Sequence, residues 1–189
     1  MKKEERDMKL RKLEEKDALY MLEWMHDDEL VRHMHKNFSS MTLEHCLDFI
    51  KNSAKSKADV HFAIVDETDD YLGTVSLKNI YDRHAEFGIV VRREAMGSGV
   101  ATYGMKRILQ YAFDELDLEF VFWCVDKNNL RALSFYDKNQ YSRIDYSELN
   151  VTVPYDEEEA NRFVWYKCED VKIEELVQIL AENIKDKGL

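Results

Sequence analysis

The stretch that decides the fold is Glu86–Leu109, which reads EFGIVVRREAMGSGVATYGMKRIL. Its first six residues are mostly apolar and predict a buried strand, and the part from Val100 onwards carries apolar residues at helical spacing. Between them lies a turn that contains Gly97 and Gly99. The sequence therefore predicts a strand, a short glycine-rich turn and a helix that starts directly from the turn.

The turn has the properties of a site for a phosphate group. Glycine allows a positive φ and lets the backbone approach a ligand without an intervening Cβ. The first turn of a helix presents unsatisfied N–H donors and the positive end of the helix dipole. We therefore expect a phosphate or pyrophosphate to lie against the backbone of Met96, Gly97, Ser98, Gly99, Val100 and Ala101. A plain connection between a strand and a helix also explains the two glycines.

Two better-known phosphate motifs do not fit this turn. A P-loop needs a lysine followed by Ser or Thr, and no such pair follows the glycines. A dinucleotide fingerprint needs a third glycine at the position where Thr102 stands.

The composition restricts the class of partner. The formal net charge is −11, which is a poor match to nucleic acid because lysine and arginine supply most of the affinity for phosphate backbones. An acidic surface would attract a cationic substrate such as a polyamine or a basic peptide. Acidity also keeps a protein soluble, so both interpretations stay open.

The cysteines and the chain ends predict a soluble cytoplasmic protein without a membrane segment. Cys46, Cys124 and Cys168 are far apart and form neither a disulfide framework nor a zinc signature. The N-terminal MKKEERDMKL lacks the apolar core of a signal peptide, and no apolar run approaches the length of a membrane span.

Hydrophobic periodicity predicts an α/β fold, a mixed sheet of about seven strands with helices on both faces. The predicted strands are Met8–Leu13, Val60–Asp66, Tyr71–Ile80, Glu86–Val91, Leu118–Val125, Tyr141–Leu149 and Arg162–Cys168. The predicted helices are Lys16–His26, Thr42–Lys55, Val100–Phe113, Leu130–Asn139 and Ile173–Ile184. We expect one domain over residues 1–170 and an appended helix in 171–189 that packs on the sheet or on a second subunit of a homodimer.

A second sequence motif follows the glycine turn further along the chain. Asn129–Tyr136 reads NLRALSFY and matches the pattern Asn-x-x-Ala-x-x-x-Tyr in full. Met96–Ala101 matches the two small positions of [Gln/Arg]-x-x-Gly-x-[Gly/Ala] and departs at its first, where Met96 stands. Together the motifs resemble the GNAT acetyltransferase superfamily. Ala85–Val91 is similar to the RimJ/RimL and spermidine N-acetyltransferase branch, and the helix around Trp24 is similar to acetyltransferases of amino-sugar nucleotides.

The resemblance implies acetyl-CoA as a co-substrate and a single GNAT-like domain. It assigns the cofactor pyrophosphate to the glycine turn and the pantetheine arm to the backbone of Ile89, Val90 and Val91, with a further contact from Asn129. The thioester oxygen gathers charge in the transition state, and a backbone N–H near Val90 is the expected donor.

The same resemblance assigns two catalytic roles. Tyr136 is the expected general acid for the leaving thiolate, because a phenol is neutral at pH 7 and can donate a proton. Glu86 is the candidate base for the amine, and His84 is a second candidate. A packed tyrosine and an ordinary strand carboxylate are the structural alternatives for Tyr136 and Glu86.

The acceptor side is expected to involve Trp24, His26 and Asp27, together with His33 and His35, because the first two helices form one wall of the acceptor site in this family. His26, His33 and His35 fit no standard metal-ligand spacing, so no metal is predicted. The predicted activity is transfer of acetyl to a primary amine of a small molecule, either a polyamine or an amino-sugar nucleotide. The alternatives are a protein N-terminal acetyltransferase and a catalytically silent acyl-CoA-binding module.

Overall fold

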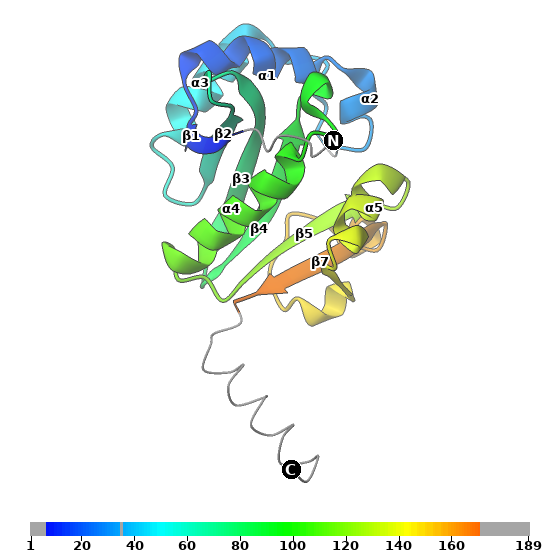
Figure 1. Cartoon of the computed structure of the whole chain (residues 1–189). Coiled ribbons are helices and arrows are strands. Elements are labelled where there is room, and N and C mark those ends of the chain that lie inside the picture. Colours follow the sequence, from blue (N-terminus) through cyan, green and yellow to red (C-terminus); the bar gives the residue numbers. More distant parts are fainter. Residues whose placement is uncertain (1–6, 35, 171–189) are drawn as a thin grey trace, which may run out of the picture.

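The computed structural model describes residues 7–34 and 36–170, and its elements are drawn in Figure 1. The strands are β1 Lys9–Lys12, β2 Val60–Val65, β3 Tyr71–Tyr81, β4 His84–Val91, β5 Phe120–Asp126, β6 Ser142–Ile144 and β7 Phe163–Glu169. The helices are α1 Ala18–Met25, α2 Asp28–Val31, α3 Leu43–Ser53, α4 Val100–Asp114, α5 Leu130–Lys138 and α6 Glu157–Ala160. The predicted helix Ile173–Ile184, and with it residues 171–189, lies outside the described residues.

The seven strands form one mixed sheet in the order β1-β2-β3-β4-β5-β7-β6. Strands β1 to β4 pair in an antiparallel manner, β4 and β5 are parallel, and β5, β7 and β6 are again antiparallel. The chain reaches the parallel neighbour through the crossover helix α4, as a parallel pair requires. The predicted fold class is confirmed.

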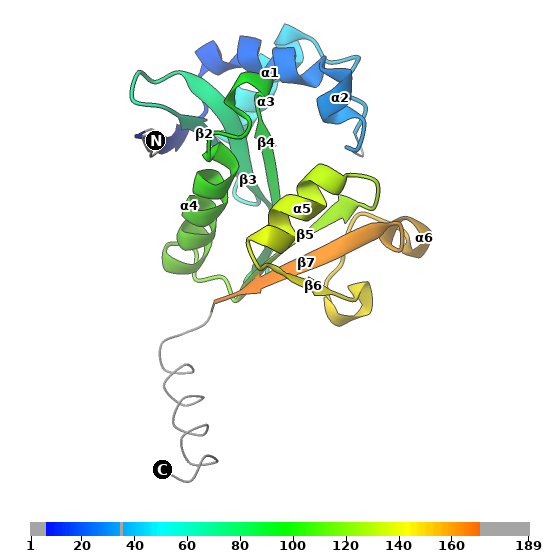
Figure 2. The same ribbon diagram turned by 45° about the vertical axis from the view of Figure 1, so that its right-hand side comes forward.

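Helices cover both faces of the sheet, and strand alternation separates two cores. In β4, Phe87 and Ile89 pack with α4 and α5, whereas Val90 packs with α1 and α3 on the other face. Figure 2 shows α4 and α5 over one face and α1 over the end of the sheet that β3 and β4 reach. Residues 149–163, with α6, cover the remaining part of the second face beside β5 and β7.

Strands β4 and β5 separate soon after they meet. Their pairing covers His84–Glu86 against Phe120–Phe122 and stops there. Beyond Glu86, β4 stays paired with β3 as far as Val91, and β5 stays paired with β7 as far as Asp126. Figure 1 shows the two strands together at their lower ends and spread apart above. The sheet therefore consists of two halves that share one short parallel seam.

The predicted strand Tyr141–Leu149 is too long. The observed β6 ends at Ile144, because the carboxylate of Asp145 accepts hydrogen bonds from the backbone N–H and hydroxyl of Ser147. These bonds and the contact of Glu148 with the backbone of Asp145 start a 3₁₀ turn instead of extending the strand. Two four-residue helices, α2 and α6, were not predicted; Asp27 and Asp156 cap them.

Within residues 7–34 and 36–170, none of the helices combines the length and the hydropathy that a bilayer crossing requires.

Gly73 is required where β3 passes β4. A Cβ on Gly73 would lie 2.3 Å from the carbonyl oxygen of Val90, which is backbone and cannot turn away. A Cβ on Gly88 would meet only the side chain of Lys78, at 3.4 Å. We predict that Gly73→Ala lowers the free energy of unfolding by about 2–3 kcal/mol through overpacking, or the melting temperature by roughly 4–10 °C.

The matched control is Gly88→Ala, which should change the free energy of unfolding by less than about 1 kcal/mol. Urea unfolding followed by circular dichroism measures both variants. Equal effects of the two substitutions would contradict the steric account of Gly73.

Candidate active site

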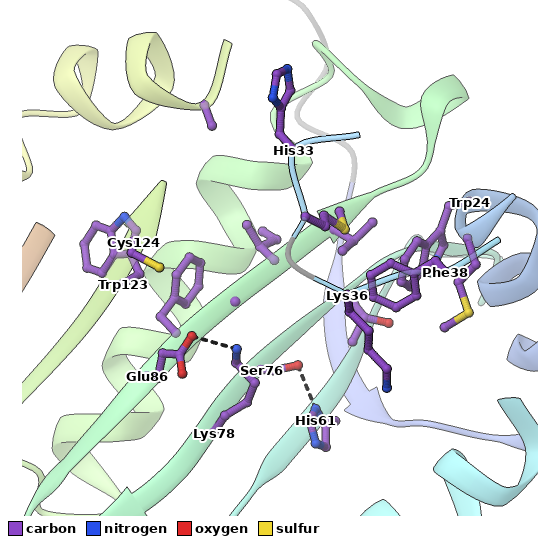
Figure 3. A pocket seen from close by; sticks show the side chains of 18 of the residues that line it. Trp24, His33, Lys36, Phe38, His61, Ser76, Lys78, Glu86, Trp123 and Cys124 are labelled. Carbon is purple, nitrogen blue, oxygen red and sulfur yellow. Dashed lines mark hydrogen bonds and ion pairs between the residues drawn. The ribbon is translucent and has the colours of Figure 1, made fainter. Parts of the chain in front are cut away.

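A cleft of about 730 Å³ lies where β4 and β5 part. Residues 86–90 of β4 form one side and residues 123–126 of β5 form the other, while α1, α3 and the start of α5 complete the walls. Because β4 and β5 share no hydrogen bonds here, side chains from both faces of the sheet line the same cleft. Figure 3 shows part of this lining.

Glu86 lies at the point of separation, on the last β4 residue that pairs with β5. Its side chain is buried, and Oε1 accepts a hydrogen bond from Nζ of Lys78 at 2.9 Å (Figure 3). The amide of Asn79 donates to Oε2 at 3.3 Å, and the hydroxyl of Tyr155 approaches Oε1 at 3.5 Å. A buried carboxylate is thus held by three donors, one of which is positively charged.

Tyr136 lines the cleft from the other face of the sheet. It belongs to α5 and packs with Trp123, whose ring centroid is 5.2 Å away. Burial raises the pKa of Tyr136 above its ordinary value. The phenol is therefore neutral across the physiological pH range, and its hydroxyl makes no hydrogen bond within the described residues.

The upper part of β4 has an unpaired edge that faces the cleft. The N–H of Arg92 donates to the carbonyl of Leu72 on the β3 side, at 2.9 Å. Backbone groups alternate along an extended strand, so Val90 also directs its groups towards β3. Ile89 and Val91 direct theirs towards the edge that β5 leaves. Ile89 and Val90 line the cleft, and Val91 lies just beyond its lining.

Two further side chains of the cleft bear on a bound ligand. The indole N–H of Trp123 is the only buried side-chain nitrogen or oxygen without a hydrogen-bond partner in the described part of the chain. Asn129 caps α5, with its Oδ1 accepting the N–H of Ala132 at 3.2 Å, and also lines the cleft.

The glycine turn lies outside the cleft lining, between the end of β4 and the start of α4 (Figure 1). Gly97 has φ +71° and Gly99 has φ +92°, which are left-handed conformations, and a Cβ on either would meet no atom within 4 Å. Gly99 is the N-cap of α4, and no side chain caps this helix. The Ser98 hydroxyl donates to the carbonyl of Ala95, so the turn offers backbone rather than side-chain donors.

Of the predicted acceptor residues, Trp24 and His33 line the cleft, and His35 lies outside the described residues. The indole N–H of Trp24 donates to the hydroxyl of Tyr71 at 3.2 Å, and the Trp24 ring meets that of Phe38 edge-on. His26 lies outside the lining, with Nε2 2.9 Å from the carbonyl of Met41. Asp27 caps α2 and also lies outside, because the chain turns away from the cleft after α1.

The arginines beside the glycine turn are bound to carboxylates. Arg93 pairs with Asp27 and Glu29, and its hydrogen bonds and charge hold the pKa of the Asp27 carboxyl below its usual value. Arg92 pairs with Glu23 at 3.0 Å and lies over the ring of Tyr20. These contacts fix the loop after β4 against α1 and α2.

Several residues of the cleft were not predicted. Lys78 reaches Glu86 across the hairpin, and Tyr155 reaches it from a loop 69 residues away in the sequence. His61 and Ser76 face each other on β2 and β3, 2.7 Å apart (Figure 3), and burial lowers the pKa of His61. The hairpin pattern could have indicated the cross-strand pairs; no local signal indicated Tyr155.

The described residues contain no group of three or more His, Cys, Asp or Glu side chains that could hold a metal ion. His33 lines the cleft, 3.8 Å from a carboxylate oxygen of Asp126, and His35 lies outside the described residues.

The chain is similar to known acetyltransferases. A family model described as an acetyltransferase (GNAT) domain matches residues 7–142. Spermidine N(1)-acetyltransferase of Escherichia coli strain K12 is 28% identical over 137 residues, which cover 71% of this chain and 73% of the relative. Acetyltransferase PseH of Campylobacter jejuni is 24% identical over 125 residues, or 66% of this chain and 76% of PseH.

A solved structure shares the fold. Spermidine N-acetyltransferase from Vibrio cholerae, in complex with CoA and spermine, superposes with a TM-score of 0.72 at 20% sequence identity. The match covers 86% of this chain and 95% of that protein.

Cys124 lies in the cleft beside Glu86 and Tyr155, and burial raises the pKa of its thiol to about 12, with a further contribution from the charge of Glu86. At pH 8, only roughly one such thiol in ten thousand is ionised, and the thiolate is the nucleophile. We predict that iodoacetamide alkylates Cys124 at least about tenfold more slowly than a small thiol at pH 8, and faster as the pH rises.

Peptide mass spectrometry measures the rate, and Cys124→Ser identifies the modified peptide. Alkylation of Cys124 at the rate of a small thiol would contradict the raised pKa.

Proposed function

The chain belongs to the GNAT acetyltransferase family and is an acetyl-CoA-dependent N-acetyltransferase, and we propose that it acetylates a primary amine of a small molecule in the cleft between β4 and β5. The substrates named for its relatives, spermidine and spermine, indicate the class of acceptor, and PseH represents a second branch. The proposed acceptor is either a polyamine or an amino-sugar nucleotide.

One observation carries this proposal: a buried carboxylate and a neutral phenol line the same cleft from opposite faces of the sheet. Transfer to an amine needs a group that takes a proton from the nucleophile and a group that gives one to the leaving thiolate. Glu86 suits the first role and Tyr136 the second. Their separation on two faces leaves the space between β4 and β5 for the reacting groups.

The residues present fit acetyl-CoA. The unpaired edge at Ile89 and Val91 offers backbone N–H and C=O groups to a pantetheine arm, in the manner of an added strand. The open space around Gly99 and the uncapped start of α4 suit a pyrophosphate. Acetyl-CoA supplies the activated thioester.

The side chains define how protons move. We propose that Glu86 accepts a proton from the acceptor ammonium, directly or through a water, while Lys78 stabilises its carboxylate. One N–H of the same unpaired edge, that of Ile89 or Val91 next to the predicted donor position at Val90, would stabilise negative charge on the thioester oxygen instead of binding the arm. Tyr136 would protonate the departing sulfur. The raised pKa of Cys124 disfavours an acetyl-cysteine intermediate and favours direct attack by the amine.

The alternatives make different predictions for a panel of amines. A protein N-terminal acetyltransferase would acetylate peptides and not small amines, and a silent binding module would bind acetyl-CoA without releasing thiol. The homodimer stays a prediction; one structure of the Vibrio cholerae relative is dodecameric.

We predict that Tyr136→Phe lowers kcat roughly tenfold or more, because the variant keeps the packing of the ring and loses only the proton donor. Thiol release from acetyl-CoA, measured across small amines, gives the rates. Tyr103→Phe on α4, outside the cleft lining, is the matched control and should keep full activity. Unchanged turnover in Tyr136→Phe would remove this residue from the mechanism.

We predict that Gly99→Ala weakens CoA binding by tenfold or more, since its Cβ would enter the open space at the uncapped helix start and alanine is strained at φ +92°. Isothermal titration with CoA measures the affinity. The control is Asn150→Ala, which places an alanine at another left-handed position, φ +49°, outside the cleft lining. It should lower stability slightly and leave CoA affinity unchanged. Normal CoA affinity in Gly99→Ala would exclude the turn as the pyrophosphate site.

A further inference from the structure

We infer that the acceptor carries an anionic group, a carboxylate or a phosphate, beside its primary amine, and that Lys36 binds this group. The inference rests on the proposed function and narrows it, because it selects an anionic amine over a polyamine. It depends on the charges that line the cleft.

Acidic side chains are scarce along the cleft. Of its described lining residues, only Glu86 and Asp126 carry carboxylates. Glu86 is bound by the ammonium of Lys78 at 2.9 Å. Asp126 lies 3.8 Å from Nδ1 of His33 and accepts the backbone N–H of Asn128 at 2.7 Å. A polyamine brings several ammonium groups, and those that do not react would lose water here with Asp126, which already accepts one N–H, as the one carboxylate of the described lining besides Glu86.

Two lysines add positive charge from different walls. Lys78 comes from β3, and Lys36 comes from the segment between α2 and α3 (Figure 3). Nζ of Lys36 lies 5.9 Å from the centre of the Phe38 ring and forms no ion pair with any of the described residues. Since this ammonium already approaches the aromatic wall, a second cation there would meet a like charge.

An anionic group would be attracted to Lys36 at this wall, where a cation would be repelled. A carboxylate or phosphate next to Lys36 would form charge-assisted hydrogen bonds, which are roughly twice as strong as neutral ones. The reactive amine of the same molecule would then lie towards Glu86, on the opposite side of the cleft.

The overall negative charge of the protein does not reverse this preference. The chain carries a net charge of −11, which attracts cations at long range. At physiological ionic strength the screening length is about 8 Å, so distant surface carboxylates contribute little inside the cleft. The groups that line the cleft decide which acceptor binds, and there the two lysines balance the two carboxylates.

The test compares kcat/KM, from thiol release, for spermidine and a matched set of amino sugars. The sugars are an amino sugar without an anionic group, its uronic acid, which bears a carboxylate, and its uridine diphosphate derivative, which bears phosphates. The amine is placed at different ring positions in separate assays. We expect kcat/KM for at least one anionic form to exceed that for the sugar without an anionic group, and that for spermidine, by about tenfold or more. The form that does so identifies the anionic group.

The role of Lys36 is tested with Lys36→Gln. We expect the ratio of kcat/KM between the preferred anionic acceptor and its neutral counterpart to fall about tenfold, mostly through KM. Titration calorimetry with the same acceptor, without acetyl-CoA, should show a matching loss of affinity. Lys51→Gln, an exposed lysine of α3 outside the cleft lining, is the matched control and should leave ratio and affinity unchanged.

The outcomes separate the two proposals. If no amine is acetylated although acetyl-CoA binds, the proposed function fails. If kcat/KM for spermidine equals or exceeds that for the anionic acceptors, the proposed function stands and this inference is wrong. A ratio that Lys36→Gln leaves unchanged would also overturn the inference, because the anion would then bind elsewhere.

Discussion

The structure depends on the parting of β4 from β5 after Glu86 and Phe122. Each strand has a longer partner on its other side: β3 holds β4 as far as Val91, and β7 holds β5 as far as Asp126. Because neighbouring strands twist relative to one another, two firmly paired halves joined by a short seam diverge. The divergence leaves unpaired backbone groups at an inner edge, where a ligand can satisfy them.

The seam also explains the charge of the cleft. Glu86 is buried where the strands separate, and a carboxylate in that position requires partners. Lys78 stands opposite it in the β3–β4 hairpin and supplies the nearest positive charge. The contact occupies Oε1 of Glu86 with the ammonium of Lys78, so that oxygen is not open to a second ammonium. The same contact therefore bears both on the proposed base and on the proposed preference for an anionic acceptor.

The sequence predicted what local patterns encode. Periodicity identified the seven strands, and the two motifs placed the glycine turn and Tyr136 on the correct elements. It could not predict that β4 and β5 separate, since this depends on which neighbour each strand keeps. His26 and Asp27 follow Trp24 in sequence, but the chain turns at the end of α1 and only Trp24 reaches the cleft. Tyr155 was missed because tertiary packing alone brings its loop to Glu86.

The separation of the strands is what allows one cleft to contain both of the proposed catalytic groups. In a continuous sheet, alternate side chains point to opposite faces, and the hydrogen-bonded backbone lies between them. Glu86 shares its face with Val90 and α1, whereas Tyr136 packs with Phe87 in the core beneath α4 and α5. These two groups line a common space only because no hydrogen bonds close the sheet beyond Glu86. A substitution that extended the β4–β5 pairing by two residues would therefore separate the proposed acid from the proposed base, even with every side chain of the cleft retained.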